Sequence, residues 1–144
     1  MAEPSPEHDR LAHEAVDAAF VVHTVLGPGL LESVYEQYLG YELEARGIPL
    51  QRQVILPLSY RGRPVDAGYR MDMVVGGLLV VEIKAVEKLL PLHDAQLDTY
   101  LKLSGCQLGV DLPEVPASLR RSPCISFAYR TVREPSAMEW IFQT

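Results

Sequence analysis

The N-terminal third of the chain shows the apolar spacing of helices. Apolar side chains recur every three or four positions from about residue 10 to residue 26, which predicts an amphipathic helix. The Gly-Pro-Gly stretch at 27–29 ends that helix, because proline and glycine disfavour its continuation. A second helix is expected to end near Gly47. Its inner face is predicted to carry Leu31, Val34, Tyr35, Tyr38 and Leu39.

Short extended segments follow the two helices. Residues Gln53 to Tyr60 predict a strand and residues 61–64 a turn, and YRMDMVVGGLLVVEIKAV (69–86) predicts two strands joined near Gly76 and Gly77. This order of elements predicts an α/β (α+β) domain with a mixed central sheet flanked by helices. The remaining predicted elements are a helix from His93 to Ser104 and strands in CQLGVDL (106–112) and CISFAYRTV (124–132).

Length and composition indicate one globular domain. The chain has 144 residues, of which 48% are hydrophobic and 22% charged. No apolar run approaches the roughly 18 residues of a membrane span, and the acidic start MAEPSPEHDR does not resemble a secretory signal. We therefore expect a cytoplasmic protein that does not enter a membrane. Cys106 and Cys124 lack the CxxC spacing of a zinc site and are expected to be small buried or half-buried residues.

The formal net charge of −6 conceals a local basic segment. Residues 1–45 hold nine acids against Arg10 alone, a balance of −8, whereas residues 46–70 hold five arginines against Asp66 alone, a balance of +4. The acidic total argues against tight, indiscriminate binding of duplex nucleic acid, but it leaves room for a local cationic surface. The alternative interpretation is that these arginines are only solvated residues of loops and edge strands.

Three charges interrupt the apolar pattern of the two strands within residues 69–86. Glu82 and Lys84 are two positions apart, so in a strand both side chains point to one face, and Asp72 lies on the adjoining strand. A structural ion pair is one interpretation, although buried ion pairs are poor stabilisers. Two carboxylates in one small volume repel each other unless a cation lies between them, and oxygen ligands suit Mg²⁺ or Mn²⁺.

The length of the loop between these strands decides whether the carboxylates meet. A two-residue turn at Gly76 and Gly77 places Asp72 opposite Val81, on the face away from Glu82. A three-residue loop with a bulge, which the two glycines allow, places Asp72 across from Glu82 instead. We predict such a loop, or else a bulge elsewhere in residues 72–82 or a bend near Asp72, because a metal site requires Asp72 and Glu82 on the same face of the sheet.

These residues carry a family resemblance. Asp72, nine further residues and then Glu82-Ile83-Lys84 resemble the D…ExK signature of the PD-(D/E)XK nuclease superfamily. GLLESVY (29–35) is similar to the G-x-x-E-x-x-Y element of the GxxExxY proteins, a group within that superfamily. The resemblance implies a restriction-endonuclease-like fold. It divides the chain into a flexible N-terminus (1–9), a PD-(D/E)XK-like core (10–112) and a divergent C-terminal extension of the same domain (113–144).

Carried over by position, the resemblance implies roles for individual residues. Asp72 and Glu82 would bind Mg²⁺ or Mn²⁺, with the backbone carbonyl of Ile83 as a further ligand. Glu32, near the start of the second helix, would reach the metal directly or through water; alternatively it only complements the dipole of its helix. Lys84 would orient or activate the attacking water and stabilise charge on the phosphate.

Further residues have supporting or alternative interpretations. Gln96 would contact the water or the phosphate, or else it is an ordinary surface glutamine. Arg70 would keep Asp72 ionised or contact a phosphate. His23 and Tyr35 are interpreted mainly as packing groups near the ligands.

The function implied by the resemblance is metal-dependent hydrolysis of phosphodiester bonds, in DNA rather than RNA. The alternative is a catalytically inactive module on the same fold that binds nucleic acid or another protein. Small nucleases of this superfamily often form homodimers, so a homodimer is the alternative to a monomer. The extension after Val110 is expected to supply an edge strand, a dimer contact or a partner site with Trp140, Ile141 and Phe142 as apolar anchors, or else to be a disordered terminus.

Overall fold

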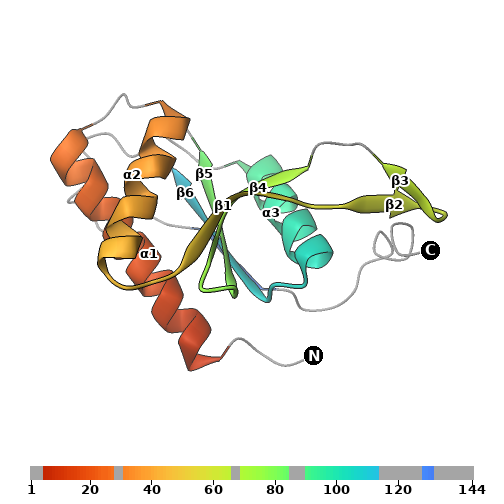
Figure 1. The fold of residues 1–144 in the computed structure, drawn as a ribbon, viewed down its shortest axis with the longest axis horizontal. Coiled ribbons are helices and arrows are strands. Elements are labelled where there is room, and N and C mark those ends of the chain that lie inside the picture. Colours follow the sequence, from red (N-terminus) through yellow and green to blue (C-terminus); the bar gives the residue numbers. More distant parts are fainter. Residues whose placement is uncertain (1–4, 28–30, 66–68, 85–89, 114–127, 132–144) are drawn as a thin grey trace.

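The computed structural model describes residues 5–27, 31–65, 69–84, 90–113 and 128–131. Its helices are α1 (Pro6–Leu26), α2 (Glu32–Ala45) and α3 (Pro91–Ser104). Its strands are β1 (Leu50–Ile55), β2 (Leu58–Tyr60), β3 (Arg63–Val65), β4 (Arg70–Val75), β5 (Leu79–Lys84), β6 (Leu108–Pro113) and β7 (Ala128–Thr131). Among these residues, a five-stranded sheet has the order β1-β4-β5-β6-β7, and β2 and β3 form a separate two-stranded sheet (Figure 1).

The central sheet is mixed, as predicted. Strands β5 and β6 are parallel, whereas the pairs β1–β4, β4–β5 and β6–β7 are antiparallel. The parallel pair is connected through α3, because a parallel connection must cross from one end of the sheet to the other. The fold class is therefore mixed α/β, with helices packed against a mixed sheet.

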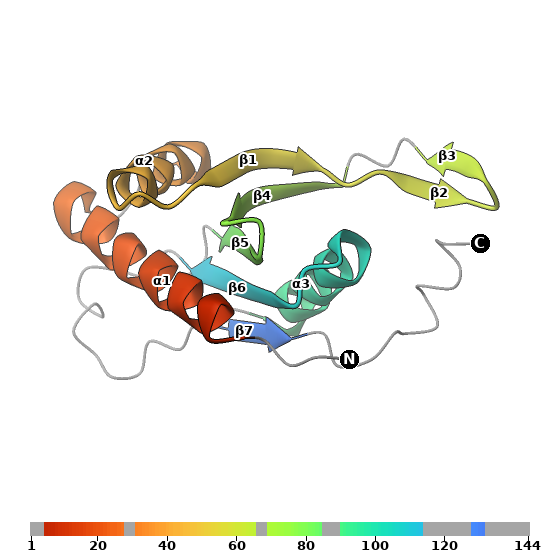
Figure 2. The same ribbon diagram turned by 60° about the horizontal axis from the view of Figure 1, so that its bottom comes forward.

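The two faces of the sheet belong to two different apolar clusters. Helices α1 and α2 cover one face, where Met73, Val81 and Ile83 join their core. Helix α3 covers the other face, where Val74 and Val80 pack against Leu97, Tyr100 and Leu101 (Figure 2). Because successive side chains of a strand point to opposite faces, each central strand contributes to both clusters.

The β4–β5 hairpin has the loop that a metal site requires. Val75 pairs with Leu79, so Gly76, Gly77 and Leu78 form a three-residue loop. Both glycines have positive φ, at 60° and 71°. Continuing the register past the pair Met73–Val81 brings Asp72 opposite Glu82. The prediction of a three-residue loop is therefore confirmed.

Strand β4 also bends next to Asp72. Met73 packs in the α1 and α2 cluster, whereas Met71, two positions earlier, packs in the α3 cluster. In a regular strand these two side chains share a face. Gln53 of β1, which lies across from Asp72 between the pairs Arg52–Met73 and Val54–Met71, has a φ of 52°. This distortion of the neighbouring strand accompanies the bend.

Several sequence-based expectations were wrong in detail. Helix α1 starts at Pro6 rather than near residue 10, because proline is well suited to the first helical position. Leu31 and Tyr38 are exposed, at 72% and 44%, so they do not belong to the inner face of α2. Leu43 is fully buried there, one turn after Leu39. The inner stripe therefore runs further along α2 than its first apolar residues indicated.

Residues 53–64, which were predicted as one strand and a turn, belong to the three strands β1, β2 and β3. β1 ends at Ile55 and β2 begins at Leu58, with Pro57 between them, because proline has no N–H for a ladder. The expected turn at 61–64 is shorter, since β3 already begins at Arg63. The β2–β3 hairpin is thus an additional structure that the hydrophobic pattern did not predict.

Some expectations concern residues outside the described part of the chain. These are Cys124, the segments 124–127 and 132–144 with Trp140, Ile141 and Phe142, and the glycine at 29. Cys106 is a half-buried free thiol, as expected. No helix among the described residues has the length and apolar character needed to traverse a lipid bilayer.

Gly76 and Gly77 allow a matched test of the loop. Both have positive φ, but a Cβ on Gly76 would lie 2.8 Å from Leu11 Cδ1, whereas a Cβ on Gly77 meets nothing within 4 Å. We expect Gly77→Ala to lower the free energy of unfolding by about 1–2 kcal/mol. Gly76→Ala should lower it by about 1 kcal/mol more, because α1 packs on the turn. Urea unfolding measures both; equal losses would show that contact with Leu11 does not restrain the loop.

Candidate active site

Two carboxylates continue the β4–β5 ladder where backbone pairing ends. The last backbone pair of β4 and β5 is Met73–Val81, and beyond it each carboxylate accepts a hydrogen bond from the other strand. Asp72 N donates to Glu82 Oε1 at 2.9 Å, and Ile83 N donates to Asp72 Oδ2 at 2.9 Å. Each of these hydrogen bonds crosses from one strand to the other. They hold the two acids side by side on adjacent strands.

The position of Glu82 is electrostatically unfavourable for a negative charge. Glu82 is 3% exposed, and burial raises the pKa of its carboxyl from 4.5 to about 9, with the charge of Asp72 as the second cause. The backbone hydrogen bond from Asp72 and the charge of Lys84 lower this pKa only in part. A buried acid beside a second carboxylate is stabilised by a proton or by a metal cation. The pair therefore has the electrostatic property expected of a cation site.

Lys84 and Gln96 link β5 to α3 beside this pair. Lys84 Nζ donates to Gln96 Oε1 at 2.9 Å and lies 3.9 Å from Glu82 Oε2. The shorter contact is with the amide, so Lys84 is only weakly paired with Glu82. The Lys84 side chain is 16% exposed, compared with 4% for Glu82. The ammonium thus lies closer to solvent than the carboxylate.

Helix α3 is held close to the sheet by packing on Gly109 of β6. A Cβ there would lie 2.8 Å from Leu97 Cδ1, so a larger residue would push the helix away. This close approach positions Gln96, the neighbour of Leu97 on α3, above the end of β5. Tyr100 follows Gln96 by one helical turn.

Asp111 and Tyr100 are site residues that the sequence reasoning missed. Asp111 is 0% exposed and is the partner of Glu82 in the parallel β5–β6 register, so the two side chains share a face. Burial raises the pKa of Tyr100 to about 12, and the charges of Glu82, Asp72 and Asp111 raise it too. The Tyr100 phenol therefore stays protonated next to three carboxylates.

The remaining predicted residues are on α1, α2 and the start of β4. Glu32 is an exposed residue in the first turn of α2. Its role as a ligand stays a prediction. Arg70 is exposed at the start of β4, two positions before Asp72. His23 and Tyr35 are buried and stack on each other between α1 and α2, with ring centroids 4.6 Å apart.

The described residues offer a small set of oxygen donors to a metal ion. Within the described segments, no group of three or more His, Cys, Asp or Glu side chains is arranged to hold one. Mg²⁺ commonly uses only one or two protein carboxylates and completes its shell with water and substrate phosphate. Asp72 and Glu82 meet that smaller requirement, because both are oxygen donors and their mutual repulsion is relieved by a cation.

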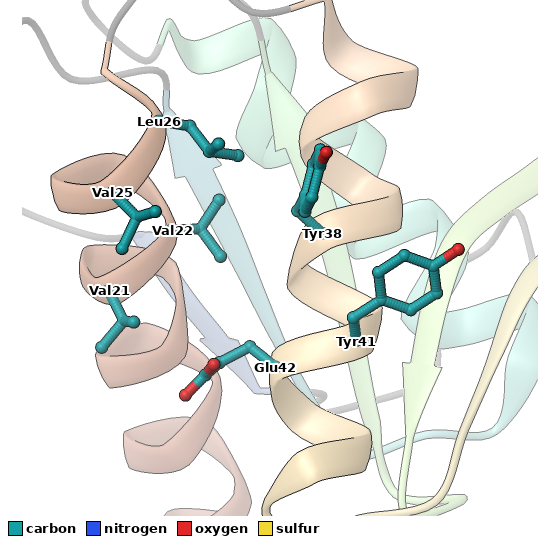
Figure 3. Close-up of a pocket in the computed structure, with 7 residues that line it drawn as sticks. All are labelled: Val21, Val22, Val25, Leu26, Tyr38, Tyr41 and Glu42. Atoms are coloured by element: carbon teal, nitrogen blue, oxygen red, sulfur yellow. The ribbon is translucent and has the colours of Figure 1, made fainter.

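A separate pocket between α1 and α2 has a different chemical character. It has a volume of about 200 Å³, and Figure 3 shows Val22, Leu26 and Glu42 between the two helices, whereas the Tyr41 ring points away from α1. The lining is apolar and aromatic apart from Glu42, so it offers no groups for phosphate chemistry. The lining residues are Val21, Val22, Val25, Leu26, Tyr38, Tyr41 and Glu42.

The raised pKa of Glu82 predicts a specific dependence of stability on pH. Because the folded-state pKa of about 9 exceeds the ordinary 4.5, stabilisation by the protonated carboxyl is complete below pH 4.5 and is lost as the pH rises toward 9. In chelator, the wild-type free energy of unfolding should fall relative to that of Glu82→Gln over this interval by a few kcal/mol. Urea titrations at several pH values measure this, and parallel pH profiles for the two proteins would contradict it.

Of three comparisons with known proteins, one identifies a family. A search of curated proteins and a search of solved structures each found no match. The family model of the PD-(D/E)XK nuclease superfamily matches residues 9–112, which include β4, β5 and α3 with Asp72, Glu82, Lys84 and Gln96. The match covers most of the sequence. The chain therefore belongs to the PD-(D/E)XK nuclease superfamily.

Proposed function

We propose that this protein is a Mg²⁺- or Mn²⁺-dependent nuclease that hydrolyses phosphodiester bonds in DNA, and that it belongs to the GxxExxY group. The observation that carries the proposal is the joined Asp72–Glu82 pair with Lys84 and Gln96 beside it. Superfamily membership supports the reaction class. DNA is proposed over RNA, and the experiments below include both.

Asp72 and Glu82 would hold the cation, with the carbonyl of Ile83 and the side chain of Glu32 as further donors. When bound, the cation supplies positive charge against the phosphate oxygens. The backbone hydrogen bonds from Asp72 N and Ile83 N keep the two carboxylates in fixed orientations before substrate arrives. Preorganisation of this kind avoids a reorganisation cost during the reaction.

Lys84 would contact the phosphate or the attacking water. Its ammonium has three donors, of which one is directed to Gln96 Oε1. Gln96 thereby fixes the direction of the side chain, and its own amide N–H groups stay available to a water or phosphate oxygen. Tyr100, which stays protonated at neutral pH, adds a hydroxyl near the carboxylates.

A binding module without catalytic activity is the second candidate. It is favoured by the finding that no three metal-ligating side chains are gathered within the described segments. In that case the carboxylate pair would serve only to close the sheet between β4 and β5. The two candidates differ in their response to metal ions and in turnover.

Catalysis is tested by a cleavage screen on duplex, branched and single-stranded DNA and on RNA, with Mg²⁺ and with Mn²⁺. We expect metal-dependent cleavage that Glu82→Gln and Lys84→Ala each reduce by about 100-fold or more. Gln96→Ala should cause a smaller loss, since it only releases Lys84. Arg10→Ala, which breaks an exposed ion pair with Glu7 on α1, is the control and should cleave like the wild type. DNA retention without turnover by the wild type would favour the binding module.

Metal binding is tested by thermal unfolding. A cation that binds only the folded protein stabilises it by mass action, so millimolar Mg²⁺ or Mn²⁺ should raise the melting temperature. Asp72→Asn removes one of the two repelling charges and should raise the melting temperature of the metal-free protein while abolishing the response to metal. A wild-type melting temperature that ignores both ions would count against the nuclease.

A further inference from the structure

The β2–β3 hairpin, residues 58–65, projects away from the rest of the fold. Figures 1 and 2 both show it extending beyond the ends of β1 and β4, clear of the helices. Its strands pair from Leu58–Val65 to Tyr60–Arg63, and Arg61 and Gly62 form the turn at the tip. Tyr60, Arg61 and Arg63 are exposed. The segment contains no acidic residue.

The arginines of this hairpin differ from three arginines of α1, α2 and β1. Arg10, Arg46 and Arg52 each form an ion pair with a carboxylate, at distances between 2.7 and 3.2 Å. Arg46 in particular joins α2 to Glu14 and Asp17 of α1. In the part of the chain that the structure describes, no ion pair involves Arg61 or Arg63. Their positive charge is therefore available to a partner outside the protein.

Arg61 also occupies an unfavourable backbone position. Its φ of 49° and the φ of 73° at Gly62 are those of a tight type I′ turn, in which asparagine and glycine are preferred. A side chain with a positive φ costs stability, and strained residues are retained where their side chain has a use. The Arg61 guanidinium lies 5.6 Å from the centre of the Tyr60 ring. This stacking orients the cation and leaves its N–H edge open.

The base of the hairpin is next to the carboxylate pair. Ile55 pairs with Arg70, and Leu56 N donates to Tyr69 O just beyond that pair. Asp72 follows Arg70 by two positions, with Gln53 across from it. Arg61 follows Gln53 by eight positions, so the tip lies at most about 29 Å from Gln53. One turn of duplex DNA is about 34–36 Å long, so the tip can reach a phosphate within one turn of a bond at Asp72.

We propose that the β2–β3 hairpin is a DNA-binding arm in which Arg61 and Arg63 contact backbone phosphates of a duplex on one side of the scissile bond. This inference rests on the proposed function, and it describes how the DNA would be held at the Asp72–Glu82 site. A two-stranded ribbon is narrow enough to enter or follow the major groove. Contacts to phosphate position the protein without reading base sequence.

The test measures binding separately from cleavage. Fluorescence anisotropy with a 30-base-pair duplex in chelator gives Kd over a range of salt concentrations for the full-length protein. Arg61→Asn and Arg63→Ala should each raise Kd by about 3–10-fold, and the double variant should reduce the slope of log K against log salt by about 2. Arg10→Ala removes the same charge elsewhere and should leave Kd and slope unchanged.

A structural role of Arg61 is separated from a binding role by stability. Asparagine suits the type I′ turn better than arginine, so Arg61→Asn should keep or raise the melting temperature while it weakens binding. Arg63→Lys, which retains the charge, should bind more tightly than Arg63→Ala. If Arg63→Lys binds DNA no better than Arg63→Ala, the proposed DNA-binding arm is wrong. The proposal is also wrong if the arm variants have the same Kd and salt slope as Arg10→Ala.

The failure of this inference differs from failure of the proposed nuclease. If the wild type cleaves DNA and the arm variants bind like Arg10→Ala, the arm is wrong and the nuclease stands. If the wild type never cleaves but its DNA binding depends on Arg61 and Arg63, the arm stands and the nuclease is wrong. Tighter binding of an RNA duplex than of the DNA duplex would overturn the assignment of DNA as the partner.

Discussion

The candidate site depends on one constraint, which is the end of backbone pairing between β4 and β5. At that point the carboxylates of Asp72 and Glu82 accept the N–H groups that a regular ladder would pair with carbonyls. A buried N–H without an acceptor costs about 1–3 kcal/mol, so the two acids contribute to the fold as well as to the site. The same hydrogen bonds hold Glu82, whose pKa burial raises to about 9, beside the half-buried Asp72. Ionisation of Glu82 therefore creates a repulsion that a bound cation relieves.

This arrangement is achievable because the two faces of the sheet have separate roles. Side chains on the α1 and α2 face, such as Val81 and Ile83, are apolar and build the larger core. Glu82 and Lys84 alternate with them and point toward α3, whose packing on Gly109 sets the distance to Gln96. A register change of one residue in β5 would place Glu82 in the apolar core. The three-residue loop at Gly76 thus determines whether the chain has a site at all.

Local signals in the sequence were sufficient for this part of the molecule. Alternation in β4 and β5 and the glycine pair predicted both strands and the shared face of Glu82 and Lys84. The metal-site hypothesis then required a three-residue loop or else a bulge or bend, and the structure has the loop. Asp111 was not predicted, because its position beside Glu82 results from parallel pairing across α3 and leaves no local pattern. The β2–β3 hairpin was missed for a different reason. Its strands are three residues long, Pro57 precedes the first and Pro64 is the middle residue of the second, so no alternation develops.

The distances around Lys84 show how the charges are divided between the interior and the surface. Its ammonium is 2.9 Å from Gln96 Oε1 but 3.9 Å from Glu82 Oε2, so it does not form a close ion pair with the buried acid. A closer pair would lower the pKa of Glu82 and weaken its need for a metal cation. Because the neutral amide is its nearer partner, the Lys84 ammonium can bind an anion that comes from solvent. The acidic groups in the interior suit a metal cation. The cations toward solvent, Lys84 and the arginines of the β2–β3 hairpin, suit a phosphate backbone.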